Sequence, residues 1–341
     1  MSNQVAREVK SAVTRSDVAR HAGVSTAVVS YVVNNGPRPV APSTATRVRN
    51  AIQELGYRPN TGARALRRGV SDAIGLILVD ISNPFFAEYA VEIETVAHQG
   101  GQALILGNSL GQAELERELV DDLLGRRVDG LLMTSAHADA DPLADLRPDV
   151  PVVMIDAAHP VPGRRSLGSD HAQGAAMLVQ HLIDVHQRSS IALVVGHGQS
   201  PKPDRREDGW KRTLMAAGLP LGPIARNAYT REGGYAAGQE LLALDQLPQA
   251  IFASSDQQAI GVLRALHEHG LEVPTDIAVV SYDGTAESEF AWPPLTVARQ
   301  QVAAMAAAAI KMLTEPGPDE VHRLFAPELV IRRSCGCGQQ R

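Results

Sequence analysis

Cysteine is nearly absent from this chain: two occur among 341 residues, Cys335 and Cys337. This scarcity excludes a disulfide-stapled extracellular scaffold and is typical of proteins in a reducing cytoplasm. The two cysteines form a Cys-x-Cys motif, but that spacing bridges poorly, and no second cysteine pair exists to complete a zinc site. We therefore expect residues 335–341 to form a flexible, reduced tail.

Long apolar runs and enzyme motifs are missing as well. No stretch approaches the roughly 18 consecutive apolar residues that span a bilayer, and the N-terminus has no apolar core of signal-peptide length. There is no GxSxG elbow, no P-loop and no GxGxxG after a strand. The pairs His181/His186 and His267/His269 lack the i,i+4 spacing of a helical metal site. We expect a cytoplasmic protein that is not an enzyme, with no catalytic residues, cofactor, metal site or membrane partner.

What the chain does have is an uneven distribution of charge. Residues 1–70 hold eleven Lys and Arg against three Asp and Glu, whereas the remainder holds 21 against 35, a difference that the net charge of −6 hides. A basic segment gains free energy by neutralising DNA phosphates and releasing counterions, while an acidic one is repelled by the duplex. The N-terminal segment is therefore the part that we expect to bind DNA.

Residues 14–34 predict two short helices around a tight turn. Thr14 and Asp17 have the spacing of a capping box, and Gly23 can leave the first helix with a positive φ. Ser25 can cap the second helix, whose valines face the first. The outer face of the second helix then presents four side chains: Thr26, Ala27, Ser30 and Tyr31. An ordinary αα-hairpin with a solvated face has the same pattern, and the basic charge is what favours DNA binding.

A third helix and a junction follow. Residues 43–55 have helical apolar spacing and stop at Gly56, which completes a three-helix headpiece. Arg58-Pro59-Asn60 then blocks continuation of the helix, while residues 63–67 could form one more short turn. Without the headpiece before it, this junction would be taken for a flexible basic linker.

Beyond residue 72, apolar runs alternate with amphipathic helical stretches, which predicts buried parallel strands joined by helices. Seven such strands are expected: Ile74–Val79, Ala103–Gly107, Gly130–Thr134, Val152–Asp156, Ile191–Val195, Ile251–Ala253 and Ala278–Tyr282. About 270 residues exceed one sheet of ordinary size, so we expect two α/β lobes. Ligand clefts open at the carboxyl ends of such strands. Five polar residues fall there: Asp80, Asp156, Ser255, Asp256 and Asp283.

The motifs VTRSDVARHAGVS, VVSYVVNN, LGYRPNTGARALRRG and DISNPFF resemble the LacI/GalR (lactose/galactose-repressor) family of bacterial transcription regulators, and the resemblance runs from Val13 to about Ser334. It implies a helix-turn-helix headpiece followed by a two-lobed periplasmic-binding-protein type I body with parallel, Rossmann-like sheets. The implied parts are a headpiece (13–58), a hinge helix and linker (59–72), and an effector and dimerisation domain (73–334). Within that domain, lobe 1 would hold about 73–169 and 298–325, and lobe 2 about 170–297 and 326–334.

By the same resemblance, the second helix enters the major groove of DNA. Thr26, Ala27 and Tyr31 occupy base-reading positions, and the phosphate-facing set is Ser25, Ser30 and Asn34, with Thr14 at the start of the headpiece. The hinge folds when two copies pair on the minor groove, where Leu66 would act as the wedge between base steps.

The chain departs from the family pattern at several positions. Tyr31 stands where many relatives carry arginine, so the operator is expected to differ from the commonest family sequence. Ala41 replaces the usual serine cap of the third helix, so either the cap moves to a neighbour or typically ~1 kcal/mol of stability is lost. Gly62 replaces an alanine in the hinge, which favours a segment unstructured off DNA. Gly284 stands where relatives often have a second aspartate, so the identity of the ligand is less transferable than the fold.

The resemblance also implies an effector pocket. Phe85 and Phe86 match positions that line the pocket in the family, and Arg206 in DRREDGW matches an arginine that binds the effector. Tyr229 matches an aromatic residue that stacks on the ligand, and Asp283 matches a carboxylate that binds ligand hydroxyls. We add Asp156, Ser255 and Asp256 as strand-end candidates, although Phe86 can equally be core and Asp256 can instead cap a helix.

Together these features predict a homodimeric repressor of a near-palindromic operator, whose DNA affinity changes when a small ligand, most simply a sugar, closes the cleft. One alternative is a purine- or nucleoside-responsive, corepressed regulator. Two others on the same fold are a sugar-binding transport protein and an enzyme acting on sugars or nucleosides.

Overall fold

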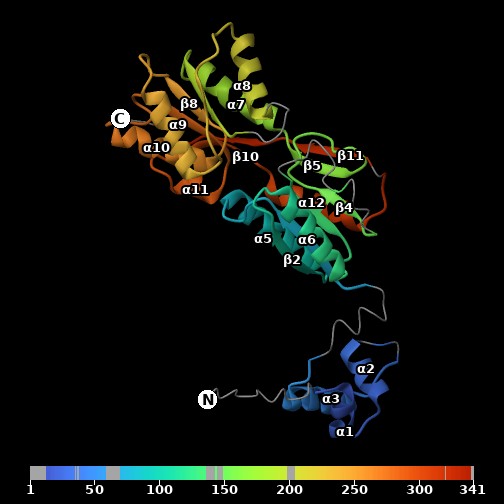
Figure 1. Cartoon of the computed structure of the whole chain (residues 1–341). Coiled ribbons are helices and arrows are strands. Elements are labelled where there is room, and N and C mark those ends of the chain that lie inside the picture. The colour runs from blue at the N-terminus through green and yellow to red at the C-terminus, as the bar shows by residue number, and fades with distance from the viewer. Residues whose placement is uncertain are drawn as a thin grey trace, which may run out of the picture. The chain divides into compact units, whose positions relative to one another are not determined.

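The computed structural model describes residues 13–34, 36, 38–58, 70–135, 143, 149–197, 204–318 and 320–338. The chain divides into two compact units, Met1–Ser71 and Asp72–Arg341 (Figure 1). Leu66 and Gly62 of the expected hinge lie outside the described residues. Among the helices that are described, none is long and apolar enough to cross a membrane.

The first unit contains three helices: α1 (Arg15–Ala22), α2 (Thr26–Asn34) and α3 (Pro42–Leu55). The expected capping box is present, because the Thr14 hydroxyl accepts from the Asp17 amide and the Asp17 carboxylate accepts from the Thr14 amide. Gly23 ends α1 with φ 63°, and Ser25 Oγ accepts from the Val28 amide at the start of α2. The starts of both helices are thus set by side chains within a few residues.

A small apolar core joins these three helices. It contains, fully or largely buried, Val18, Ala19, Ala22, Val29, Val48, Ala51 and Tyr57. Ala41 at the start of α3 makes no side-chain cap, and Pro42 occupies the first turn. The start of α3 therefore lacks the hydrogen bond that a serine at position 41 would supply. His21 Nε2 lies 2.7 Å from Glu54 Oε2, a contact that connects α1 to α3 at the surface.

The second unit holds two six-stranded sheets, one in each lobe. The first sheet has the strand order β11-β5-β4-β3-β1-β2, and all its pairings are parallel. Its strands are β1 (Ala73–Leu78), β2 (Ala103–Asn108), β3 (Leu131–Met133), β4 (Val152–Met154), β5 (Arg165–Ser169) and β11 (Val321–Phe325). Its helices are α5 (Pro84–Gln99), α6 (Ala113–Gly125) and α12 (Val302–Thr314). The apolar sides of α5 and α12 meet one face of this sheet, and α6 covers the other.

The second sheet has the order β12-β10-β9-β8-β6-β7, and its β12 edge is antiparallel. Its strands are β6 (Ile191–Val195), β7 (Ile224–Arg226), β8 (Ala250–Ala253), β9 (Ala278–Asp283), β10 (Thr296–Arg299) and β12 (Glu328–Val330). Its helices are α7 (His171–Asp184), α8 (Arg205–Ala216), α9 (Arg231–Leu242), α10 (Asp256–Glu268) and the short α11 (Ala286–Phe290). The pair α7 and α8 covers one face and the pair α9 and α10 covers the other, as Figure 1 shows.

The chain crosses between the lobes three times: after β5, after β10 and after β11. The crossings are hydrogen-bonded to one another, since the Asp170 amide donates to Phe325 O and Gln301 Nε2 donates to Ala326 O. Neighbouring crossings of this kind leave a cleft between the lobes, at the carboxyl ends of the parallel strands.

All seven expected strands are present, but two expectations were wrong. The strand at Ala103 is only partly buried, because β2 lies at the edge of its sheet and has one neighbour. Residues 335–338 are not a flexible tail: they form a turn in which Cys335 is 0% exposed and belongs to the core of the second lobe.

Candidate functional sites

The outer face of α2 is the candidate DNA-reading surface of the headpiece. Ser25, Thr26 and Ala27 are exposed, and Ser30 and Tyr31 are half-buried. A Cβ built on Gly36 would lie 2.7 Å from Tyr31 Cδ1, so a glycine at this position lets the turn after α2 pack against the phenol ring. Asn34 is the last residue of α2, and the structure describes no more than that about it.

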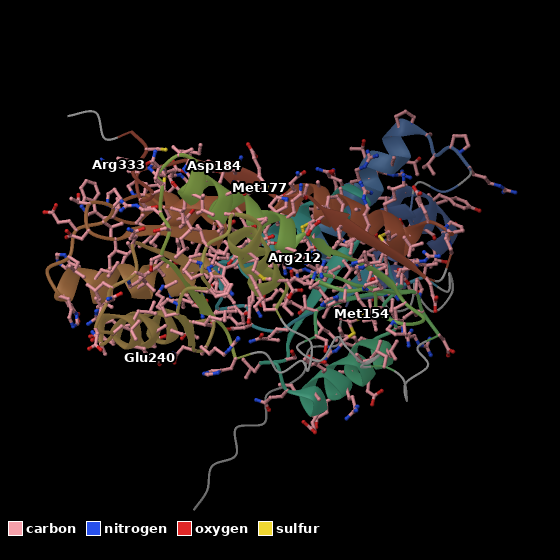
Figure 2. The ribbon with its side chains drawn as sticks, turned by 90° about the horizontal axis from the view of Figure 1, so that it is seen from above. Met154, Met177, Asp184, Arg212, Glu240 and Arg333 are labelled. Carbon is pink, nitrogen blue, oxygen red and sulfur yellow. The ribbon has the colours of Figure 1, made fainter. Side chains whose placement is uncertain are left out.

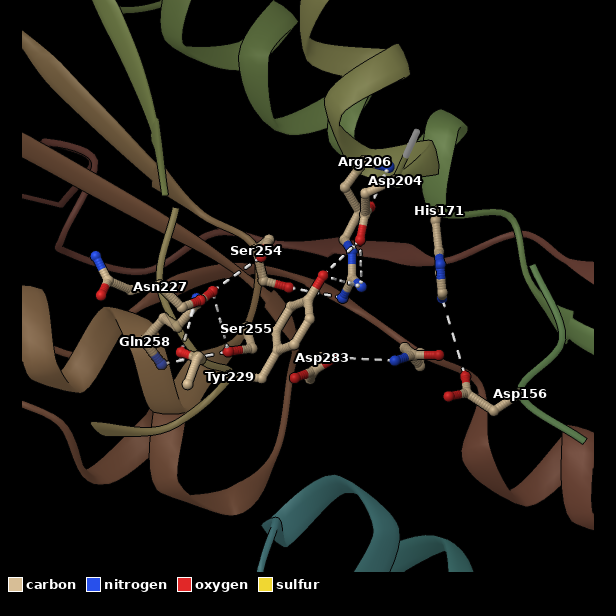
Figure 3. A network of polar contacts seen from close by, with 12 residues as sticks. Asp156, His171, Asp204, Arg206, Asn227, Tyr229, Ser254, Ser255, Gln258 and Asp283 are labelled. Atoms are coloured by element: carbon tan, nitrogen blue, oxygen red, sulfur yellow. Dashed lines mark hydrogen bonds and ion pairs between the residues drawn. The ribbon is translucent and has the colours of Figure 1, made fainter. Parts of the chain in front are cut away.

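In the second unit, Arg206 is the centre of a polar network (Figure 3). Asp204 caps α8, and its carboxylate accepts from Arg206 Nε at 3.0 Å and from Arg206 Nη2 at 2.9 Å. Arg206 Nη1 donates to Ser254 O at 2.8 Å. Tyr229 OH donates to Asp204 Oδ2 at 2.5 Å and accepts from Arg206 Nη2 at 3.2 Å. The guanidinium is therefore fixed in one plane, a geometry suited to forked hydrogen bonds.

Close packing also fixes the ring of Tyr229. A Cβ on Gly196, at the end of β6, would lie 1.9 Å from Tyr229 Cε2, so only glycine leaves room for the ring there. The loop before it is held by Gln258, whose Nε2 donates to Asn227 O and Ala228 O at 3.1 Å each. The second lobe thus builds a rigid wall from residues of α8, α10 and the β7–α9 loop (Figure 3).

Two carboxyls follow neighbouring strands of the second sheet. The Asp256 carboxylate accepts from Ser281 Oγ at 2.6 Å, and from the amide and hydroxyl of Thr285 at 2.7 and 2.8 Å. Asp283 accepts from Gln300 Nε2 at 2.9 Å, and its backbone has φ 106°, an unfavourable conformation for a non-glycine residue. Asp256 therefore holds a loop, whereas Asp283 keeps one carboxyl oxygen for which no partner is described.

The first lobe and the crossings contribute buried polar atoms without hydrogen-bond partners. They are Tyr89 OH, Asp156 Oδ1, His171 Nε2 and Gln300 Oε1. Asp156 Oδ1 and His171 Nε2 lie 4.0 Å apart, too far for a hydrogen bond (Figure 3). Asp156 is also held at φ 55°. Since unsatisfied buried polar groups and backbone strain both cost free energy, their coincidence here indicates a site completed by a ligand.

The pKa shifts around Arg206 differ from those of the other buried groups of the candidate site. Burial would raise the pKa of Asp204, but the Arg206 charge and hydrogen bonds hold it well below its usual value. Burial raises the pKa of Asp156 to about 7, against the opposing charge of Arg206. Burial, together with the charge of Arg206, lowers the pKa of His171 to about 3. Burial, followed by the nearby Asp256 charge, raises the pKa of Asp283 well above its usual value. At neutral pH the site therefore has one fixed ion pair beside neutral or half-ionised groups.

A cavity of about 510 Å³ adjoins these groups. Its lining shares Asp283 and Gln300 with the polar network and extends to Glu88 of α5 and Arg299 of β10. The volume falls within the range of small-molecule sites. Two hydrogen bonds join the lobes nearby: the Ala286 amide donates to Glu88 Oε1 at 2.9 Å, and Gln257 Nε2 donates to Ser82 O at 3.4 Å.

The structure brings together Asp156, Arg206, Tyr229 and Asp283 from the expected pocket. Phe85 is 4% exposed and belongs to the first-lobe core, with the half-buried Phe86 packed against that core. Ser255 caps α10, and its hydroxyl and the Asp256 carboxylate are engaged within the protein. Four further residues of the candidate site were not predicted from the sequence: Tyr89, His171, Asp204 and Gln300. Of these, Asp204 had a detectable signal, as the acidic cap two residues before Arg206.

A helix-turn-helix headpiece joined to a two-lobed body with a polar cleft defines the class of ligand-responsive DNA-binding regulators. Comparison with known proteins supports this class. Residues 14–60 match bacterial regulatory proteins of the lacI family, and residues 179–335 match a periplasmic binding protein-like domain. Catabolite control protein A of Priestia megaterium is 37% identical over 310 residues, covering 89% of this chain and 92% of that protein. The HTH-type transcriptional repressor PurR of Glaesserella parasuis is 35% identical over 336 residues, with 94% and 98% covered.

Two solved structures are similar across nearly the whole chain. The lac repressor dimer bound to operator and the anti-inducer ONPF has a TM-score of 0.84 at 27% identity, covering 95% of this chain and 99% of that one. The complex of the transcriptional regulator CelR with cellobiose has a TM-score of 0.70 at 28% identity, with 94% and 99% covered. This chain belongs to the LacI family of bacterial transcription regulators. The expectation that it is not an enzyme is confirmed, because these relatives and neighbours are regulators.

Proposed function

We propose that this protein is a homodimeric repressor whose grip on a near-palindromic operator is changed by a small polyhydroxylated ligand, a sugar, bound between its two lobes. Its dimeric, operator-bound structural neighbour supports the assembly, and the cellobiose complex supports the ligand class. A two-fold protein binds two half-sites related by the same symmetry.

One observation carries the ligand proposal: unpartnered buried polar atoms of Asp156, His171 and Tyr89 lie across from a rigid Arg206–Asp204–Tyr229 wall. A sugar ring offers hydroxyls that both donate and accept, and C–H faces that pack on aromatic rings. Such a ligand would satisfy Asp156 and Tyr89 of the first lobe and His171 at the start of α7, while Arg206 and Tyr229 of the second lobe hold it. Ligand binding would therefore favour a closed arrangement of the lobes.

At the DNA, we propose that Thr26, Ala27 and Tyr31 read bases, and that Ser25, Ser30 and Asn34, together with Thr14, serve the backbone. The exposure of Thr26 and Ala27 supports the first part. Leu66 would be the minor-groove wedge of a hinge helix, which lies outside the described residues. Because a phenol offers a single hydroxyl where arginine forks onto guanine, Tyr31→Arg should shift operator preference toward a guanine-containing half-site.

The test of this function couples two measurements on the full-length protein. A thermal-shift screen of sugars, nucleobases and nucleosides identifies the ligand, since a ligand at 100 times its dissociation constant stabilises by ~2.7 kcal/mol. Fluorescence anisotropy with a labelled operator then measures DNA affinity with and without that ligand. We expect a change of roughly 5–150-fold. A ligand that binds the body but leaves operator affinity unchanged would contradict the proposal.

A second candidate ligand class is a purine base or nucleoside acting as a corepressor. The observation that favours it is Asp156, whose pKa of about 7 leaves the carboxyl able to donate as well as accept, as the ring edge of a purine requires. The relative named PurR is consistent with this class. The screen separates the two: a purine hit that tightens operator binding selects corepression, and a sugar hit that loosens it selects induction.

A further inference from the structure

A second group of polar side chains meets away from the cleft, at the other end of α7. His181 lies in the last turn of α7, and His186 follows two residues after the helix ends. Cys335 and Cys337 lie in the turn after β12, about 150 residues later in the chain. Figure 2 labels Asp184, which lies between the two histidines in sequence, and Arg333, two residues before Cys335, toward the same edge of the view. We predicted no metal site because neither the histidine pair nor the cysteine pair has a metal-binding spacing by itself. The fold brings the two pairs together.

The separations between the donor atoms are those of a tetrahedral metal centre. His181 Nε2 lies 3.4 Å from Cys335 Sγ and 3.6 Å from Cys337 Sγ, and His186 Nε2 lies 3.4 Å from Cys337 Sγ. All four candidate ligand atoms lie within 4.8 Å of one another. Zinc bonds of roughly 2.3 Å to sulfur and roughly 2.0–2.1 Å to nitrogen, at tetrahedral angles, place sulfur and nitrogen about 3.5 Å apart. The observed distances agree with that value.

The backbone is shaped to present both thiols to the histidines. Gly336, between the cysteines, has φ 114°, and a Cβ there would lie 3.1 Å from His186 Cε1 and Nδ1. Ser334 fixes the turn, because its hydroxyl donates to Val279 O at 2.6 Å and accepts from the Thr296 amide at 2.8 Å. The positive φ therefore favours glycine at position 336, and a larger residue there would press on the His186 ring. The turn is anchored to two strands of the second sheet, β9 and β10.

The surroundings are those of a closed, structural site. Cys335 is fully buried and His181 nearly so, while Cys337 and His186 are half-buried and leave a route of entry. Thr296 Oγ1 donates to Cys335 Sγ at 3.1 Å, a contact that a thiolate keeps as an acceptor. Burial, and then the neighbouring Cys335, raises the pKa of Cys337 to about 11. Burial lowers the pKa of both histidines. The lowered pKa values favour neutral imidazoles, the form that binds metal.

We propose that His181, His186, Cys335 and Cys337 form a Cys2His2 site for a zinc ion that clamps the C-terminal turn to α7. Two thiolates and two imidazoles are the donor set that selects zinc, and four protein ligands leave no open position for catalysis. On binding, the two thiols release two protons, and the two negative charges balance the divalent cation. The ion adds a cross-link to the second lobe, whose core already includes Cys335.

The experiment uses full-length protein purified without chelator and assayed for metal by mass spectrometry of the dissolved sample. We expect about one zinc ion per chain. Replacement of zinc by Co²⁺ should give the visible absorption bands of a tetrahedral site and a thiolate-to-cobalt band in the near ultraviolet. Stripping the metal with a chelator should lower the Tm, and zinc chloride should restore it.

The variants C337S and H186Q alter the two half-buried ligands, which are the ones least needed for packing. Both should retain the fold by circular dichroism yet lose stoichiometric zinc and the cobalt spectrum. The matched control is H267A, an exposed histidine outside the cluster, which should behave as wild type. Protein that stays metal-free when zinc is supplied would overturn the proposal, as would zinc binding unchanged in both variants. A Cys335–Cys337 disulfide in unreduced, metal-free protein that resists reduction would overturn it too.

Discussion

The two walls of the cleft differ in how far their hydrogen bonds are satisfied. On the second lobe, Arg206 is bonded to Asp204, Tyr229 and the Ser254 carbonyl. Facing it, Asp156 and Tyr89 of the first lobe have buried polar atoms with no partner. The contrast indicates a preorganised grip on one side and a set of groups on the other that a ligand completes, so the free energy of binding can be used to move one lobe relative to the other.

The same contrast separates two kinds of carboxyl. Asp256 has three hydrogen-bond donors around it and secures the loop after β9. Asp156 has no described hydrogen-bond partner on Oδ1. Burial raises the pKa of both carboxyls, to about 7 for Asp156 and to about 6 for Asp256, so the difference between them lies in their hydrogen bonds. One carboxyl stabilises the fold and the other is kept at a cost to stability, which is the usual sign of a functional residue. Four substitutions test this division, from the largest expected effect to the smallest.

Removing Arg206 should disrupt the hydrogen-bonded network of Arg206, Asp204 and Tyr229. R206A leaves the buried Asp204 carboxylate without its partner, so we expect a loss of ~3–5 kcal/mol of stability together with loss of the response to ligand. Chemical denaturation and operator anisotropy measure the two effects. The double variant D204N/R206A should recover part of the stability but none of the response. The control R205A removes a neighbouring, more exposed arginine and should leave the response intact; equal loss in both single variants would contradict the assignment.

Replacing Asp256 should affect stability alone. In D256N an amide NH2 faces hydroxyl and amide donors that a carboxylate accepts, so we expect a loss of ~1–3 kcal/mol. Ligand affinity, measured by calorimetry under conditions where the variant is folded, should stay within a few-fold of wild type. A folded D256N that no longer binds ligand would place Asp256 in the pocket instead.

Replacing Asp156 should raise the stability of the protein, whereas replacing Asp256 lowers it, and the gain should depend on pH. Its folded pKa of about 7 lies above the ordinary 3.8, so its contribution to stability is present below about pH 4 and is lost as pH rises through 7. D156N removes the buried charge and should raise the free energy of unfolding at pH 8 by an amount on the order of 1–2 kcal/mol, with a smaller gain at pH 5. Ligand binding should weaken. A gain that is larger at pH 5 would refute the assigned burial of this charge.

Removing the Tyr89 hydroxyl should have the smallest effect on the free protein. Y89F deletes a buried oxygen with no partner, so the change in stability should be neutral or a gain below ~1 kcal/mol. Affinity for the ligand should fall several-fold if the hydroxyl binds it. Y229F is the matched comparison, because that hydroxyl bonds to Asp204 and Arg206, and its loss should be destabilising. Equal changes in stability for Y89F and Y229F would contradict the proposed difference between the two walls of the cleft.

Much of the fold was predictable because it depends on short-range patterns. The Thr14–Asp17 capping box, the φ 63° glycine at Gly23 and the seven apolar strands were all found where the sequence placed them. Five of the described strands were not predicted: β5, β7, β10, β11 and β12. Their segments mix polar with apolar residues over three to five positions, so they lack the continuous apolar run by which the other seven were recognised. In the cleft, the family resemblance named Arg206, Tyr229 and Asp283, but nothing in the sequence showed that His171 comes within 4.0 Å of Asp156.

The sequence by itself determined which segments become helices or strands and which end of the chain is basic, since caps, periodicity and charge act over a few residues. The tertiary structure alone decided which polar groups are satisfied and which are left for a ligand. It alone also placed Cys335 and Cys337 beside His181 and His186. Contacts between residues about 150 positions apart leave no mark on local composition, because they arise only when the sheets bring the two segments to the same end of one helix.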